Sequence, residues 1–161
     1  MELYIKQKVF SLKDRFNVFD FNENIKYRAE GEFISLGKKL HVYDNNNNEV
    51  IYIKQKLLTF LPKYEISVAG LETVEIVKNF TFFKHEYTIP AWNMKIHGDF
   101  FAHEYTVEYG GNVIAELSKQ WLTWGDTYKI NIFNPRDELV ALAAILVVDC
   151  CMESNNNASR G

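Results

Sequence analysis

The sequence predicts an all-β fold with one helix, a closed antiparallel barrel of about 12 strands around a central hydrophobic helix at the C-terminus. Three observations support it. Short segments of alternating or β-favouring residues run through most of the 161 residues, rich in the 12 Phe and 9 Tyr that suit strands. Turn residues punctuate them without any linker-like stretch. Near the C-terminus, one segment is apolar on every face.

That segment is 134–153, NPRDELVALAAILVVDCCME. Asn134 is a suitable N-cap and Pro135 a suitable first helical residue, followed by two acidic residues in the first turn. From 139 to 148 every residue is apolar, so the helix must be buried on all sides or lie in lipid. The run is shorter than the ~20 residues of a membrane span, which favours a core helix over a membrane-inserting segment.

The end of this helix carries three further expectations. Asp149 is disfavoured by the helix dipole, and we expect it to emerge into water at the barrel mouth. The alternative is a buried carboxylate hydrogen-bonded to a strand. Cys150 and Cys151 are adjacent, a spacing that rarely forms a disulfide, so they are expected to be reduced core thiols of a cytoplasmic protein.

The strands follow from alternation and from the turns between them. The N-terminus enters a strand directly, without a secretory signal layout. The run DNNNNE at 44–49 and the pair Gly110-Gly111 are hairpin turns. The expected strand segments are 3–10, 16–19, 27–33, 39–43, 50–56, 64–68, 73–78, 80–83, 87–89, 94–96, 99–101, 104–109, 113–118, 121–124 and 128–133, with a further apolar run at 57–61.

A repeat divides the strands into two halves. Four segments begin with a lysine, continue with apolar pairs and end with an aromatic residue, and two glycine segments lie between them. The order is Lys6, Gly31, Lys54 and then Lys78, Gly98, Lys119. Two pseudo-symmetric halves of six strands would close into one barrel, which removes exposed strand edges.

Several of these segments resemble the bacterial branch of the LURP-one-related family: KQKVFSLKDRFNVFD, GEFISLGKKLHVYD, IVKNFTFFK, GDFFAHEY, SKQWLTWGDTY and the closing apolar helix. The resemblance covers residues 1 to about 152. It implies the Tubby C-terminal-like barrel, also proposed for phospholipid scramblases, as a domain over 1–153. The polar composition of 154–161, SNNNASRG, predicts a disordered tail. Plant members are linked to defence, and Tubby proteins bind phosphoinositides and DNA. The lipid-binding residues of Tubby have no residue-by-residue counterparts here.

Six lysines form the candidate site. By alternation, Lys6 and Lys8 share one face of a strand, as do Lys54 and Lys56 at the equivalent repeat positions, and Lys38-Lys39 lies between these segments. Together they would make a cationic patch for anionic lipid headgroups or a phosphorylated ligand. The alternative is that lysines on an outer face keep strands soluble.

Other chemistry has weaker support. His41, His85, His97 and His103 lack the spacing of a metal site, and we expect neither metal nor cofactor. The sequence lacks known catalytic motifs. Asp99, His103, Glu104 and Asp126 could cluster, but polar residues exposed on the surface explain them more simply. Core packing is the main expectation for the aromatic residues Trp92, Trp121, Trp124, Phe82, Phe83, Phe100 and Phe101, and a ligand or interface patch is the alternative.

We therefore expect a non-catalytic binding or scaffold domain in the cytoplasm, bound peripherally to the inner membrane surface rather than integral to it. The alternative is a cytosolic protein–protein interaction module in stress or signalling; an enzyme is the least favoured. The formal net charge of −3 gives no global basic field for nucleic acid.

Overall fold

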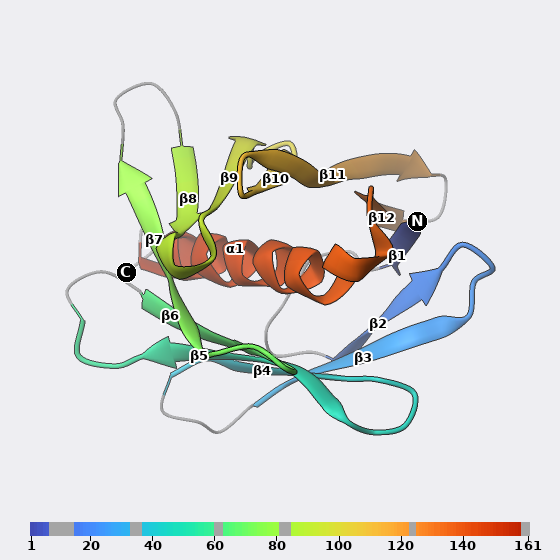
Figure 1. Cartoon of the computed structure of the whole chain (residues 1–161), viewed down its shortest axis with the longest axis horizontal. Coiled ribbons are helices and arrows are strands. Elements are labelled where there is room, and N and C mark those ends of the chain that lie inside the picture. Colours follow the sequence, from blue (N-terminus) through green and yellow to red (C-terminus); the bar gives the residue numbers. More distant parts are fainter. Residues whose placement is uncertain (7–14, 33–36, 60–62, 81–84, 123–124, 159–161) are drawn as a thin grey trace.

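The computed structural model describes residues 1–6, 15–32, 37–59, 63–80, 85–122 and 125–158 (Figure 1). Within these ranges, side chains are described except at 78–80, 85, 121–122, 125–126 and 153–158.

In this part of the chain, twelve strands form one closed antiparallel barrel. Each strand pairs with its neighbours in the chain, and β1 pairs with β12 to close the ring. The predicted fold class is confirmed. The strands are β1 (Glu2–Lys6), β2 (Arg15–Asp20), β3 (Ile25–Gly31), β4 (Lys39–Tyr43), β5 (Glu49–Lys56), β6 (Lys63–Val68), β7 (Val74–Phe80), β8 (His85–Ile89), β9 (Met94–Asp99), β10 (Glu104–Tyr109), β11 (Asn112–Leu122) and β12 (Gly125–Ile132).

The helix α1 (Glu138–Ala158) lies inside the barrel, with strands on either side of it (Figure 1). Every residue from 141 to 151 is buried, as a helix apolar on all faces requires. A single 3₁₀ turn, η2 (Pro135–Asp137), precedes it, and the Asn134 side chain accepts a hydrogen bond from the Arg136 amide at 3.1 Å. Asn134, the predicted N-cap of the helix, therefore caps the 3₁₀ turn η2 that precedes it. The helix also continues through Ala158, into the segment expected to be a disordered tail, because each added helical residue adds a backbone hydrogen bond.

Polar contacts join the helix to the inner barrel wall at both ends. At its start, the Tyr27 hydroxyl donates to Glu138 Oε1 at 2.9 Å. Near its end, the buried Tyr64 hydroxyl donates to the Cys150 carbonyl at 3.0 Å. Asp149 is buried, not emergent as expected, because it lies among the inward side chains of the strands, where its charge helps to raise the hydroxyl pKa of Tyr87 and of Tyr105. Cys150 and Cys151 are buried free thiols, as predicted.

The repeat positions fall six strands apart. Lys6, Gly31 and Lys54 lie on β1, β3 and β5, whereas Lys78, Gly98 and Lys119 lie on β7, β9 and β11. This is the strand order that two six-stranded halves require.

Two hairpins of the first half share one turn device. Asp44 accepts hydrogen bonds from the Asn46 and Asn48 amides at 2.8 and 2.9 Å, and Asp20 does the same for Asn22 and Asn24. The asparagine run is therefore the turn that its composition predicts. It fixes the β4–β5 register on which the candidate site depends.

Candidate anion-binding surface

Two lysine pairs face each other directly across neighbouring strands. Lys39 of β4 lies opposite Lys54 of β5, and Lys56 of β5 lies opposite Lys63 of β6. All four side chains are at least partly exposed, on the outer face of the barrel. Like charges at directly opposed positions destabilise a sheet, so this arrangement is unfavourable for folding alone. We refer to these four residues as the β4–β6 lysine surface.

Glutamates compensate part of this repulsion. Glu32 pairs with Lys39 at 2.8 Å, while Lys56 lies 2.5 Å from Glu75 and 3.5 Å from Glu65. Hydrogen bonds to these carboxylates raise the pKa of Lys39 and of Lys56. Lys54 and Lys63 form no ion pair within the described part of the chain. Glu65 lies opposite Lys54 on β6, and the charge of Lys63 helps to lower the pKa of Glu75, so their charges are only partly compensated.

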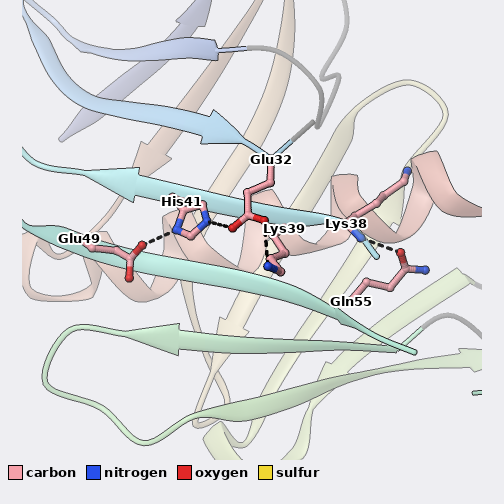
Figure 2. Close-up of polar contacts among 6 residues, drawn as sticks. All are labelled: Glu32, Lys38, Lys39, His41, Glu49 and Gln55. Carbon is pink, nitrogen blue, oxygen red and sulfur yellow. Dashed lines mark hydrogen bonds and ion pairs between the residues drawn. The ribbon is translucent and has the colours of Figure 1, made fainter. Parts of the chain in front are cut away.

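The structure brings together three of the six lysines that the sequence singled out, namely Lys39, Lys54 and Lys56. Lys38 points away from Lys39 (Figure 2), and its ammonium group is buried. Lys6 is on β1, separated from β4 by two strands, and its ammonium pairs with Glu23 at 2.6 Å. Lys8 lies outside the described residues.

Lys63 joins the surface although the sequence interpretation did not include it. It lies in the same repeat segment as Lys54 and Lys56, after a proline that separates it from them. The hairpin register that places it opposite Lys56 was the missing information.

A carboxylate–imidazole chain borders the lysine surface (Figure 2). His41 of β4 contacts Glu49 through Nδ1 at 2.5 Å and Glu32 through Nε2 at 2.9 Å, and Glu32 also holds Lys39. The Tyr52 ring lies 4.7 Å from the imidazole, centroid to centroid. Ionised carboxylates only accept hydrogen bonds, so both contacts are satisfied together when both ring nitrogens carry protons.

The chain therefore stabilises the imidazolium. Burial opposes protonation of His41, but the hydrogen bonds to Glu49 and Glu32 outweigh it and raise the pKa of the imidazole. Hydrogen bonds from Lys39 and His41 lower the pKa of Glu32. The sequence interpretation considered His41 only as a metal ligand. The available sequence signal for this contact was the spacing across the predicted hairpin. His41 lies two residues before the end of β4, and Glu49 is the first residue of β5.

Two of the residues considered for catalysis, Asp99 and His103, have other contacts in the structure. Asp99 Oδ1 accepts hydrogen bonds from the Phe101 and Ala102 amides, both at 3.0 Å, and so shapes the β9–β10 turn. The His103 ring packs edge-on against Tyr128 at 5.0 Å. Glu104 is exposed, and the side chain of Asp126 is outside the described set.

The aromatic residues divide between core and surface. Phe100 is buried and Trp92 packs against the core, as expected, whereas Phe101 is exposed. The side chains of Phe82, Phe83, Trp121 and Trp124 lie outside the described residues.

A polar hollow of about 520 Å³ lies over β10, β11 and β12. Its lining combines Glu104 and Glu116 with Lys129, whose ammonium is already held by Glu2. The hollow is therefore a poorer binding site for an anion than the β4–β6 lysine surface.

Comparisons with known proteins bear on the whole chain. The family model described as LURP-one-related matches residues 1–149. The chain is 38% identical over 159 residues to the protein named "Uncharacterized protein YxjI" of Bacillus subtilis (strain 168), covering 99% of this chain and 98% of that one.

The fold is similar to an X-ray structure of a protein from Arabidopsis thaliana. The two superpose with a TM-score of 0.63 at 11% identity, over 92% of this chain and 90% of the other. Among the described residues, no helix has the length and hydropathy needed to cross a membrane.

Proposed function

Because the chain belongs to the LURP-one-related family, whose model matches it almost from end to end, we propose that it is a non-catalytic binding domain. Its ligand is an anionic, phosphate-bearing group, and specifically the headgroups of anionic phospholipid at the inner membrane surface. The binding site is the β4–β6 lysine surface.

The opposed pairs Lys39–Lys54 and Lys56–Lys63 carry this proposal. Such pairs cost folding stability, and two consecutive pairs are an arrangement that a bound anion would stabilise. The formal net charge of the chain is −3, so the whole molecule is repelled by an anionic surface and attraction must come from a local patch. Each lysine near such a surface contributes about 1 kcal/mol to binding.

The test is cosedimentation with vesicles of graded phosphatidylserine content, at low and high salt. Wild type is expected to bind in proportion to the anionic lipid and to dissociate at high salt, because screening weakens exposed charge pairs. The double variant Lys54→Ala/Lys63→Ala is expected to bind about ten- to thirtyfold more weakly, at about 1 kcal/mol per lysine. Its melting temperature should equal or exceed that of wild type, because the substitutions relieve repulsion.

The matched control is Lys6→Ala/Lys95→Ala, which removes the same charge from β1 and β9. It should bind vesicles like wild type. Equal loss in both double variants would reduce the effect to net charge and contradict the proposal, as would absence of binding at every lipid composition. Calorimetry with inositol hexakisphosphate is the second arm: binding to it without binding to vesicles would identify a soluble phosphorylated ligand instead.

An interaction with another protein is the second candidate, favoured by apolar side chains at neighbouring strand ends. The exposed residues precede β1, follow β2 and β12, end β10 or lie at the start of β11. In that order they are Met1, Phe21, Phe133, Tyr109 and Val113. The Met1 amine donates to the Ile132 carbonyl at 2.6 Å, which holds the chain start against β12. The test is chemical crosslinking. A protein that crosslinks to wild type but not to the Phe21→Ser and Phe133→Ser variants, with vesicle binding unchanged, would support this candidate.

A further inference from the structure

The turn that leaves β5 presents two leucines to solvent. Leu57 is half exposed and Leu58 fully exposed, directly after Lys56 of the β4–β6 lysine surface. Isolated exposed apolar residues are common, but adjacent leucines at a turn that emerges from a lysine cluster are a distinct arrangement.

The backbone at Leu58 is also unusual. Its φ of 59° lies in the left-handed region, which side chains other than Gly, Asn and Asp rarely adopt. Elsewhere in the described chain such positions are held by glycines and by Asn47, Asn93, Glu23 and His103, and none by another aliphatic residue. Neither the turn nor the core therefore requires leucine here.

The neighbouring loop holds this turn in place. The Gln55 amide donates to the Lys38 carbonyl at 2.8 Å, and the Lys38 amide donates to Gln55 Oε1 at 3.1 Å (Figure 2). A Cβ atom on Gly37, whose φ is 85°, would lie 2.9 Å from Leu57 Cδ2. Glycine at 37 thus leaves room for the Leu57 side chain beside the adjoining loop.

We propose that Leu57 and Leu58 form an apolar tip that inserts into the acyl boundary of an anionic bilayer while the β4–β6 lysine surface contacts the headgroups. The proposal rests on the function proposed above and adds the part of the protein that enters the membrane. Charge identifies the occupant: lysines on the strands that enter and leave the turn fit the anionic headgroup layer, and an apolar tip fits the layer beneath it.

The decisive variant is Leu58→Asn. Asparagine tolerates the left-handed backbone and the side chain is already in water, so the melting temperature should stay the same or rise. Affinity for vesicles of phosphatidylcholine with about one-third phosphatidylserine should fall about tenfold, because a leucine side chain no longer leaves water. The matched control is Leu71→Asn in the β6–β7 turn, a half-exposed leucine away from the lysine surface, which should bind like wild type.

A direct measurement of depth complements the affinities. The tryptophan fluorescence that Leu58→Trp adds to the wild-type spectrum should shift to shorter wavelength when vesicles are added. It should also be quenched by lipid brominated on its acyl chains, whereas the fluorescence added by Leu71→Trp should show neither effect. If wild type binds vesicles and Leu58→Asn binds equally well, the apolar tip is overturned while the lysine proposal stands. If wild type binds no vesicle, both are overturned.

Discussion

His41 is the residue whose protonation state the structure defines most sharply. Its two ring nitrogens contact Glu49 and Glu32 at 2.5 and 2.9 Å, so the imidazolium completes both hydrogen bonds and the neutral ring completes one. The other charged or titratable groups around it are Lys39 on Glu32, Glu30 directly opposite on β3, and the hydroxyls of Tyr43 and Tyr52.

The raised pKa of His41 makes stability depend on pH. A group whose pKa is higher in the folded state binds its proton more tightly there. Its contribution is therefore complete below the unfolded value of about 6.5 and is lost as pH rises through the folded value. Urea denaturation of wild type and His41→Gln should show a difference in unfolding free energy near pH 6 that shrinks as pH rises to about 9.

A second histidine provides the control for this prediction. His97 contacts one carboxylate, Glu108, at 2.8 Å. His97→Gln is the matched loss of an imidazole at a single carboxylate, because a neutral imidazole can donate one hydrogen bond and satisfy a single acceptor. Identical pH profiles for wild type and His41→Gln would show that the two-carboxylate contact has no role in solution.

At the scale of elements, Glu138 fastens the helix to the barrel. It is the first residue of α1. Its carboxylate accepts a hydrogen bond from the Tyr27 hydroxyl at 2.9 Å and forms an ion pair with Lys26 at 2.6 Å, and both partners lie on β3. Burial and the nearby Glu138 carboxylate raise the pKa of the Tyr27 hydroxyl, which keeps it a donor.

Glu138→Ala should lower the unfolding free energy by about 1–2 kcal/mol, because it leaves a half-buried hydroxyl and ammonium without their shared acceptor. Asp137→Ala is the control, since it removes a neighbouring carboxylate with a comparable effect on the helix dipole and should cost about 0.5 kcal/mol. Equal losses in chemical denaturation would assign the effect to the dipole and refute the anchor.

The elements also show what the sequence could predict. The apolar run at 139–148 required burial on every side, and the alternating strands supplied the wall that buries it, so helix and barrel followed from local pattern. The strand register, which decides which residues lie opposite each other, did not follow from local pattern. Lys6 and Lys54 occupy equivalent repeat positions, yet they lie on different strands with different partners.

The site depended on information that alternation does not contain. Leu57 and Leu58 belong to an apolar run that local pattern does not separate from a buried segment, and their exposure is set by the turn after β5. Asp149 was expected in water because an isolated buried charge is costly, but in the folded chain it is buried near Tyr87 and Tyr105, which lie on other elements. Both outcomes are properties of tertiary structure.

At the scale of the whole molecule, helix and barrel each supply the core of the other. The inward residues of the strands pack on α1, and α1 is buried from 141 to 151. A barrel without the helix would enclose an empty apolar interior, and the helix without the barrel would expose apolar residues on every face. Neither part is expected to be stable alone.

Thermal unfolding should therefore be a single cooperative transition. The helical signal in far-UV circular dichroism and the near-UV signal of the aromatic residues should change at the same temperature, and the calorimetric and van't Hoff enthalpies should agree. A variant ending at Asn134, which lacks α1, should fail to give a folded barrel. A helical transition separate from that of the strands would show instead that α1 can leave the barrel while the wall persists, which the continuous burial of its central residues argues against.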